Sequence, residues 1–346
     1  MIFVTGGAGF IGSNFILNWF KSSDEPILNI DKLTYAGNLQ NLLSLSENPN
    51  YFFVEADIGN SVKIQSLLDQ HKPRAILNFA AESHVDNSIS SPRAFIETNV
   101  MGTFSILDAS RQYWMNLDSE LKSFFRFIHV STDEVYGSLK EHEAKFTELS
   151  RYQPNSPYSA SKASSDHLVR SYFHTFDFPV ITTNCSNNYG PYQFPEKLIP
   201  VVIQNALKGK KIPLYGDGLN VRDWLHVEDH CSALSEILNN GSLGEVYNIG
   251  GLNEVRNRDL VIDICELLDQ LKPNALGPSY KDQIVYVEDR LGHDRRYAID
   301  SSKLQTQLGW HPKYQFRDGL KNTVTWYLDN QSWLDSISSG AYRCEK

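Results

Sequence analysis

The sequence predicts an α/β protein built on a doubly wound parallel sheet, with a second, smaller α/β lobe. Short apolar segments alternate with segments of helical periodicity through the first half of its 346 residues. The apolar segments are nearly continuous rather than alternating, which is typical of strands buried on both faces. A glycine-rich turn at residues 6–12 directly follows the first of them and opens the first helical segment.

The elements follow from these patterns in chain order. Strands are predicted at residues 2–5, 27–30, 51–55, 75–79, 127–131, 180–184 and 246–249, and helices at 11–20, 62–71, 93–113 and 158–176. Helices that join successive strands make the sheet parallel, with right-handed crossovers. After Tyr189, closely spaced prolines and glycines break up any long element. We therefore expect one domain at 1–189 plus about 223–250, and a smaller lobe at about 190–222 and 251–346.

Composition excludes several classes of protein. Hydrophobic residues make up 41% and charged residues 21% of the chain, as in globular proteins rather than disordered ones. A net charge of −9 without a basic run makes nucleic acid an unexpected partner. Because no run of about 18 apolar residues occurs, we expect no membrane span.

The four cysteines are Cys185, Cys231, Cys265 and Cys344, which are too scattered for a metal site. We expect no metal and four unpaired thiols in a reducing compartment. Met1 leads straight into an apolar strand with no basic segment, so we expect a cytoplasmic protein without a signal peptide.

The glycine-rich turn has the pattern of a dinucleotide-binding loop. Gly6, Gly9 and Gly12 allow a tight turn, a close approach of the backbone to a pyrophosphate, and close packing of the helix on the strand. The N-terminus of the following helix attracts the anion. Asp31 ends the second strand, where a carboxylate binds a ribose hydroxyl and repels a 2′-phosphate. These features favour NAD over NADP, although the neighbouring Lys32 is a cation that could accept a phosphate.

The pattern Tyr-x-x-x-Lys occurs twice, at Tyr136/Lys140 and at Tyr158/Lys162. Gly137 follows the first tyrosine and indicates a turn, whereas the second pair lies in a helical segment. There the spacing of four residues places phenol and ammonium on one face. A phenol with an ordinary pKa near ~10 needs a nearby positive charge to act as a base. We expect Lys162 and an oxidised nicotinamide to supply it to Tyr158.

Thr132, Asp133 and Glu134 follow the buried strand at 127–131. Ligands of open parallel sheets bind at this carboxyl end. Paired carboxyl groups in such a place can divide into an acid and a base. Capping of the next segment is the alternative interpretation of these three residues.

These residues resemble the extended short-chain dehydrogenases/reductases, which have a Rossmann domain, and most closely the family of dTDP-glucose 4,6-dehydratases. The resemblance covers nearly the whole chain and rests on the stretches at 4–14, 31–39, 80–86, 131–137, 184–192, 194–200 and 222–224. The trio at 132–134 is the most specific part, since related epimerases and decarboxylases lack both acids. One departure is Leu291, where the family usually has proline.

The resemblance implies the following site. The catalytic residues are Thr132, Asp133, Glu134, Tyr158 and Lys162. The residues that bind NAD are Gly6, Gly9, Phe10, Ile11, Gly12, Asp31, Lys32, Leu33, Thr34, Asp57, Ile58, Ala80, Ala81, Thr98, Tyr158, Lys162 and Asn188. The residues that bind the nucleotide sugar, most of them from the smaller lobe, are Ser83, Thr132, Asn187, Lys197, Leu198, Pro213, Tyr215, Arg222, Asn257, Arg290, His293 and Tyr297.

The resemblance also implies a reaction. Tyr158 would take the proton of the sugar 4-hydroxyl while a hydride passes to NAD, Glu134 would take the C5 proton, and Asp133 would protonate the departing 6-hydroxyl. The implied product is dTDP-4-dehydro-6-deoxy-glucose, a precursor of rhamnose and other deoxysugars, and the implied assembly is a homodimer. The alternatives are a 4,6-dehydratase of another nucleotide-glucose (UDP, CDP or GDP), a nucleotide-sugar 4-epimerase, and a non-enzymatic NAD sensor.

Overall fold

The central element of the chain is a seven-stranded parallel sheet in the order β10-β6-β5-β4-β1-β2-β3, which confirms the predicted fold class. The computed structural model describes residues 1–275 and 277–343. The strands of this sheet are β1 (Ile2–Thr5), β2 (Ile27–Asp31), β3 (Tyr51–Glu55), β4 (Ala75–Asn78), β5 (Arg126–Thr132), β6 (Val180–Cys185) and β10 (Val246–Ile249). Each lies within two residues of its predicted bounds.

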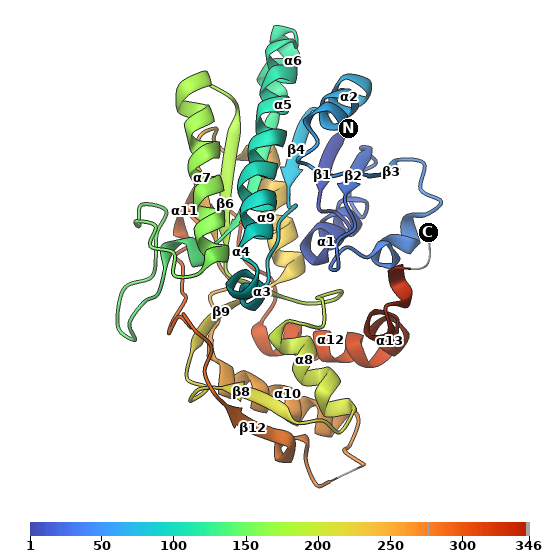
Figure 1. The fold of residues 1–346 in the computed structure, drawn as a ribbon, viewed down its shortest axis with the longest axis vertical. Helices are drawn as coiled ribbons and strands as arrows, with labels where there is room; N and C mark the ends of the chain where they lie inside the picture. The colour runs from blue at the N-terminus through green and yellow to red at the C-terminus, as the bar shows by residue number, and fades with distance from the viewer. Residues whose placement is uncertain (276, 344–346) are drawn as a thin grey trace.

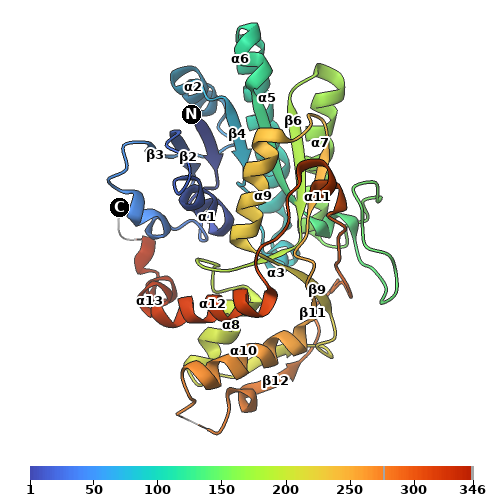
Figure 2. The same cartoon turned by 180° about the vertical axis from the view of Figure 1, so that it is seen from behind.

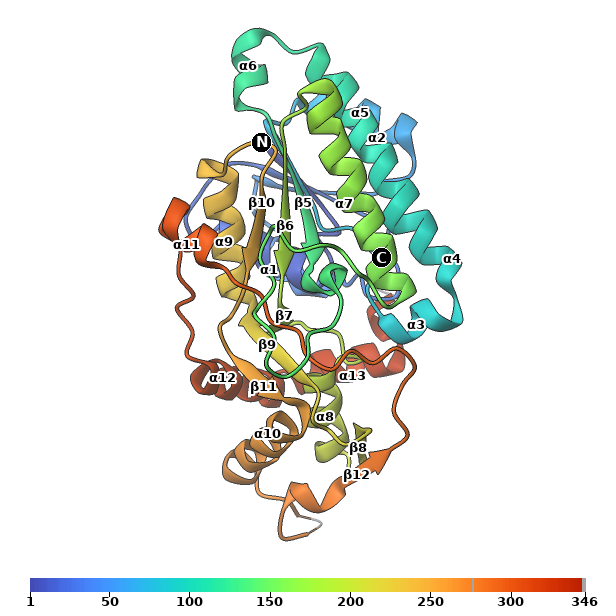
Figure 3. The same cartoon turned by 90° about the vertical axis from the view of Figure 1, so that its left-hand side faces the viewer.

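Helices cover both faces of this sheet. One face carries α2 (Ser61–His71), α5 (Thr103–Met115) and α7 (Pro157–Phe176); the other carries α1 (Phe10–Trp19), α9 (Val227–Asn240) and α11 (Ser302–Leu308). Figure 3 shows α2, α5 and α7 on one side of β5, β6 and β10, with α9 and α11 on the other. Short helices connect these elements: η1 (Leu39–Leu45), α3 (Val85–Ser90), α4 (Pro92–Phe95), η2 (Ile96–Gly102), α6 (Ser119–Phe124) and η3 (Asp133–Tyr136).

A second group of elements lies below the carboxyl ends of the large sheet in Figure 1 and is seen from behind in Figure 2. It contains a three-stranded sheet, β11-β9-β7, and a two-stranded parallel sheet, β12-β8. Its strands are β7 (Asn187–Tyr189), β8 (Ile212–Tyr215), β9 (Val221–His226), β11 (Glu254–Arg256) and β12 (Ile284–Val287). Its helices are α8 (Leu198–Leu207), α10 (Asn257–Leu271), η4 (Tyr280–Gln283), α12 (Phe316–Asp329), α13 (Gln331–Ser339) and η5 (Ala341–Arg343).

Each of the two groups of elements has hydrophobic clusters of its own. One cluster fills the space between the large sheet and α1 and α9, and another lies under α2, α5 and α7. A third joins α8, α10, α12 and α13. The predicted division into two domains stays a prediction. Leu304 and Trp310, which it assigns to the smaller lobe, pack in the first cluster, so this part of the chain returns to the large sheet.

The segment predicted as one helix at 93–113 is not a uniform α-helix. It consists of α4, the π-helix η2 and α5. Within the π-turn, Asn99 contacts distant parts of the chain: its side chain accepts a hydrogen bond from Glu82 N (2.8 Å) and donates to Ser161 Oγ (2.9 Å). A π-turn inserts an extra residue into the helix and is frequent at functional sites. Here it turns Thr98 toward the cavity described below.

Three of the cysteines, Cys185, Cys231 and Cys265, are buried free thiols, and Cys344 lies outside the described residues. In the described ranges, no group of three or more His, Cys, Asp or Glu side chains is arranged to hold a metal ion. Within the same ranges, no helix combines the length and the apolar character needed to cross a bilayer.

We predict that acid destabilises the fold through a buried histidine. His230 is fully buried and its Nδ1 lies 2.9 Å from Asn188 Oδ1; burial lowers its pKa to about 3. In the unfolded chain it binds a proton below about pH 6.5, which the folded chain does not. Stability therefore falls as the pH drops through this range, by about 2 kcal/mol from this residue alone between pH 7 and pH 5.

Urea unfolding at the two pH values measures the loss. The His230→Gln variant should lose about 2 kcal/mol less than the parent protein between them. The exposed His311 gives the matched control, since His311→Gln should leave the loss unchanged. An equal loss in the parent and His230→Gln would contradict the prediction.

Candidate active site

The glycine-rich turn joins β1 to α1 at the carboxyl edge of the large sheet. Gly6 has a φ of +67°, and a Cβ on it would lie 2.7 Å from Ala80 N. A Cβ on Gly12 would lie 2.4 Å from Gly6 O. The turn therefore tolerates no side chain at either position. It leaves bare backbone N–H groups and the N-terminus of α1 beside the cavity, as a pyrophosphate requires.

Asp31 ends β2 and is buried with both carboxylate oxygens in use. Oδ2 accepts a hydrogen bond from Ala8 N (3.0 Å) and Oδ1 accepts one from Leu33 N (2.8 Å). Burial raises the pKa of this carboxyl, and the two backbone donors oppose the rise. These bonds tie Asp31 to the glycine-rich turn, so the acid and the anion-binding loop are held as one unit.

Lys32 does not present a free cation. Its Nζ donates to Thr98 Oγ1 (3.1 Å) and lies 3.4 Å from Asp57 Oδ2. Because Asp57 already pairs with this ammonium group, Lys32 is less suited to bind a 2′-phosphate, which favours NAD.

Tyr158 and Lys162 lie in the first turns of α7, which starts with a strong cap. Ser156 and Ser159 form a reciprocal capping box, and Pro157 occupies the first helical position. Both functional side chains are buried, and Lys162 Nζ donates to Val130 O (2.8 Å). The capped helix thus presents the phenol and the ammonium on the face that meets β5.

Without the nicotinamide charge that the prediction places beside it, Tyr158 has its pKa set by protein groups. Burial raises this pKa well above its ordinary value, Glu134 adds to the rise, and a hydrogen bond with Thr132 opposes it. Burial also lowers the pKa of Lys162, against the attraction of Asp166. Protein groups alone therefore keep the phenol protonated, because burial and the charge of Glu134 both oppose its ionisation.

Asp133 and Glu134 follow β5 in the turn η3, where Thr132 Oγ1 accepts a hydrogen bond from Glu134 N (3.3 Å). Asp133 is 2% exposed, and its Oδ2 has no hydrogen-bond partner among the described residues. Burial, then Glu134, then Asp223 raise its pKa well above the ordinary value. These surroundings favour the protonated form of Asp133.

Glu134 has different surroundings from its neighbour. Burial raises its pKa too, but three cations oppose the rise: Arg290, Arg222 and Lys197. Two adjacent carboxyl groups whose surroundings differ in this way can serve as acid and base in one reaction. Of the two, Asp133 suits the acid and Glu134 the base.

The competing pair, Tyr136 and Lys140, lies elsewhere. The phenol of Tyr136 donates to Asn248 Oδ1 (2.8 Å) and accepts from Asn184 Nδ2 (2.8 Å), and Lys140 is exposed. Tyr136 is therefore held in a buried polar cluster rather than at the cavity wall.

A single cavity brings most of the predicted residues together. All five predicted catalytic residues line it, as do all the predicted cofactor residues except Leu33 and Asp57. Of the predicted substrate residues, Ser83, Thr132, Asn187 and Lys197 line it. Other residues of its wall were not predicted: Ile30, Ala36, Gly37, Ala56, Phe79, Glu82, Val130, Ser131, Cys185, Ser186, Gln193, Phe194 and Glu196.

The remaining predicted substrate residues do not line this cavity. They are Leu198, Pro213, Tyr215, Arg222, Asn257, Arg290, His293 and Tyr297. Two of them still act on it through their charge, since Arg222 and Arg290 lower the pKa of Glu134. Arg222 stacks 4.3 Å above the Tyr297 ring and donates to Asp294 O (3.0 Å).

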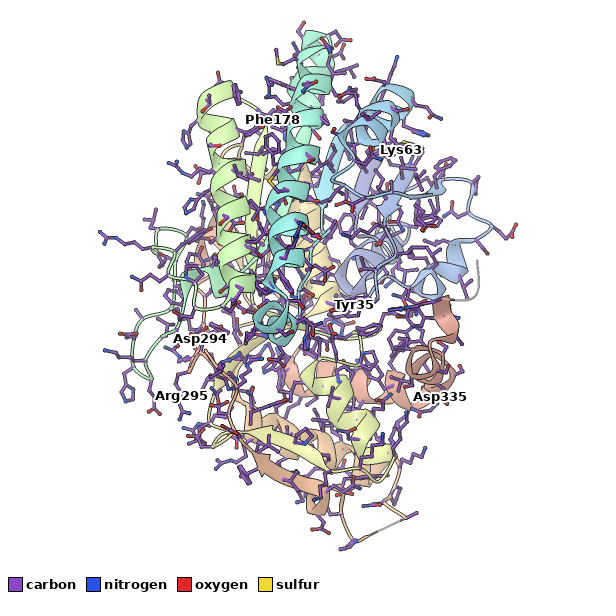
Figure 4. The ribbon with its side chains drawn as sticks, in the orientation of Figure 1. Tyr35, Lys63, Phe178, Asp294, Arg295 and Asp335 are labelled. Carbon is purple, nitrogen blue, oxygen red and sulfur yellow. The ribbon has the colours of Figure 1, made fainter. Side chains whose placement is uncertain are left out.

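Figure 4 labels Asp294 at the level where the two groups of elements meet. Arg290 lies 3.7 Å from Asp86 Oδ1, and its Nε is buried without a partner among the described residues. Next to it, the side chain of Leu291 is exposed.

Comparison with known proteins gives consistent matches over the full length. Residues 3–323 match the family described as GDP-mannose 4,6 dehydratase. The chain is 57% identical to a dTDP-glucose 4,6-dehydratase of Xanthomonas campestris pv. campestris, over 99% of this chain and 97% of the relative.

Two solved structures are similarly close. The dTDP-glucose 4,6-dehydratase of Bacillus anthracis in complex with NAD has a TM-score of 0.85 at 48% identity, covering 97% of this chain and 99% of that one. The dTDP-glucose 4,6-dehydratase of Streptomyces venezuelae with NAD and TYD bound has a TM-score of 0.88 at 43% identity, with the same coverage.

Proposed function

This chain belongs to the nucleotide-sugar 4,6-dehydratase family, and on that premise we propose that it converts dTDP-glucose to dTDP-4-dehydro-6-deoxy-glucose and water with NAD as a regenerated cofactor. It is an NAD-dependent hydro-lyase. The observation that carries the proposal is the pair of adjacent carboxyl groups, buried Asp133 and half-buried Glu134, that shares one cavity with Tyr158 and the glycine-rich turn.

The residues present fit NAD. A Cβ on Gly6 or Gly12 would collide with backbone atoms, so only glycine allows the tight turn of a pyrophosphate-binding loop, and Asp31 ends β2, where such folds bind a ribose hydroxyl. Bound NAD would supply the acceptor and donor of the hydride that moves from C4 to C6, and its positive charge would favour the phenolate form of Tyr158. Lys162 adds a second positive charge on the same side.

Protein groups carry the protons in this scheme. Tyr158, as phenolate, takes the proton of the 4-hydroxyl, and Thr132 holds the phenol in place. The new C4 ketone acidifies the C5 proton, which Glu134 removes. Asp133 gives its proton to the 6-hydroxyl as the C6–O bond breaks, and water leaves. Glu134 then returns its proton to C5, and the proton gained at Tyr158 balances the one lost from Asp133.

The second lobe would hold the nucleotide. Arg222 and Arg290 suit the diphosphate, because guanidinium groups match phosphate oxygens. Further residues proposed for the substrate are Ser83, Asn187, Lys197, Leu198, Pro213, Tyr215, Asn257, His293 and Tyr297. The unpartnered buried atoms Asn187 Oδ1, Asn257 Oδ1 and Arg290 Nε support this, since a buried polar atom is normally hydrogen-bonded.

A direct assay tests the reaction and the nucleotide together. The purified protein, without added cofactor, is incubated with dTDP-, UDP- and CDP-glucose, and the 4-keto-6-deoxy product is detected by its absorbance in alkali. We expect product from dTDP-glucose. Galactose-configured product instead would indicate a 4-epimerase, in which Asp133 and Glu134 would have no task. Product from UDP- or CDP-glucose alone would reassign the nucleotide.

We predict that a single methyl group in the glycine-rich turn weakens NAD binding. Gly12→Ala places a Cβ against the backbone oxygen of Gly6. Overpacking of this kind costs about 1–3 kcal/mol, so NAD should bind about tenfold to a hundredfold more weakly. Titration calorimetry of the NAD-stripped protein measures this. Gly277→Ala is the control, since the nearest atom to its Cβ is Asn274 Nδ2 at 3.8 Å; equal affinities in both variants would contradict the prediction.

We further propose that the protein is a homodimer in the cytoplasm. Its product would enter the biosynthesis of deoxysugars, including rhamnose. The consecutive helices α4, η2 and α5 carry three exposed apolar side chains, Ile96, Met101 and Phe104. Phe176 is also exposed, at the end of α7. Side chains of this size are typical of a face that packs against a second copy. Light scattering measures the mass, and Phe104→Glu should shift a dimer to the monomer.

A further inference from the structure

Two walls of the cavity come from distant parts of the chain. Thr34, Ala36 and Gly37 belong to the loop that follows Asp31, and Phe194 and Glu196 belong to the loop between β7 and α8. The first loop is tied to the glycine-rich turn, because Asn38 N donates to Ala8 O (2.9 Å). At the end of the cavity next to Asp31, the loop of the large sheet thus faces the loop of the second group of elements.

Tyr35 connects these two loops. Its phenol donates to Glu196 Oε1 (3.0 Å), and its ring meets the edge of the Phe194 ring with centroids 5.6 Å apart. Burial and the charge of Glu196 raise the pKa of this phenol, so it remains a donor throughout the neutral range. The bond links the two loops at this end of the cavity without using any residue of the proposed chemistry.

The C-terminal part of the chain fastens the same loop from outside. The Tyr342 phenol donates to Tyr35 O, and the Tyr342 ring packs against Phe194 at 6.3 Å. Tyr342 is 8% exposed and does not line the cavity.

Helix α13 adds two more bonds to the following segment. Trp333 Nε1 donates to Asn41 Oδ1 and Ser336 Oγ donates to Gln40 Oε1, each at 2.9 Å. Figure 4 shows Tyr35 near the level where the two groups of elements meet, with Asp335 of α13 below it.

We propose that Tyr35, Glu196 and Tyr342 form a clasp that closes the cavity over bound NAD and sets the time the cofactor stays bound. The inference rests on the proposed function, in which a hydride taken from C4 is returned to C6 of the same sugar. Loss of the reduced cofactor between these steps would strand an unfinished ketone. A clasp that opens more slowly than one catalytic cycle is completed prevents that loss. Tyr35, Glu196 and Tyr342 would act as positioning residues, not as catalytic ones.

Exchange of labelled NAD from the intact holoenzyme tests the clasp. The protein is loaded with radiolabelled NAD and diluted into excess unlabelled NAD, and the retained label is followed by rapid filtration. Tyr35→Phe, Glu196→Ala and Tyr342→Phe should each release NAD about tenfold faster, which is the effect of losing one such hydrogen bond. Tyr35→Phe combined with Glu196→Ala should release it no faster than Tyr35→Phe alone, since both remove the bond between the phenol and the carboxylate.

Tyr342→Phe is the decisive variant because the residue does not line the cavity. Its faster release, with an unchanged maximal rate at saturating NAD, would support a clasp that acts through Tyr35. Tyr286, which is 61% exposed on β12, supplies the control, and Tyr286→Phe should exchange NAD like the parent. Release within twofold of the parent in both Tyr35→Phe and Tyr342→Phe overturns the clasp. The NAD release rates are measured without substrate. A failure of the clasp proposal can therefore be distinguished from a failure of the dehydratase assay.

Discussion

Glu134→Gln should oxidise the sugar at C4 and then stop. The amide keeps the size and the hydrogen-bonding shape of the carboxylate but cannot take the C5 proton. General bases contribute about 10²- to 10⁴-fold to rates, so we expect the rate of water loss to fall about 10³-fold. The reduced cofactor should accumulate on mixing with dTDP-glucose, seen as near-ultraviolet absorbance of reduced nicotinamide in a stopped-flow instrument.

The matched control for this variant is Glu120→Gln, an exposed glutamate on α6. It should turn over like the parent protein. Exchange of the C5 hydrogen with deuterated solvent gives a second reading, since it should disappear in Glu134→Gln. Full dehydration with normal C5 exchange in Glu134→Gln would remove Glu134 from the reaction and leave the assignment of the base open.

Tyr158→Phe should block the reaction one step earlier. Without the phenol, no group takes the proton of the 4-hydroxyl, so the hydride does not leave C4. We expect the overall rate to fall about 10³- to 10⁴-fold, with no reduced cofactor formed at any time. Pre-steady-state absorbance distinguishes this block from that of Glu134→Gln, in which reduced cofactor accumulates.

The second Tyr-x-x-x-Lys pattern supplies the control. Tyr136→Phe also removes a buried phenol, which hydrogen-bonds Asn248 and Asn184. It should lower the free energy of unfolding by about 1 kcal/mol while the rate stays near that of the parent. Loss of activity in Tyr136→Phe with retention in Tyr158→Phe would reverse the choice between the two pairs.

Local patterns in the sequence predict the large sheet and the part of the cavity that depends on it. Strands buried on both faces leave a strong signal, so their carboxyl ends could be located along the chain. Residues at or just after these strand ends could therefore be predicted from the sequence: Gly6 and Gly12 after β1, Asp31 at the end of β2, and Asp133 after β5. The same rule, applied more widely, would also have found Phe79 after β4 and Ser186 after β6.

Contacts between distant segments leave no such pattern. Phe194 and Glu196 lie in an irregular loop, and their partners at the cavity wall, such as Tyr35, are far away in the sequence. The π-turn at η2 depends on what Asn99 finds across the helix interface, not on its neighbours in sequence. Charges behave similarly: the pKa of Tyr158 depends on burial and on Glu134, which the spacing to Lys162 does not reveal.

The path of the chain has a consequence for engineering. After β6 it leaves for β7, returns through α9 to β10, leaves again for β11, and comes back once more at α11 before ending in α13 and η5. The second group of elements, proposed to hold the nucleotide, therefore cannot be cut out at one junction and replaced by that of a relative. Chimeras designed to accept a different nucleotide should exchange individual side chains on a continuous parental backbone, since any block swap would sever several crossings together.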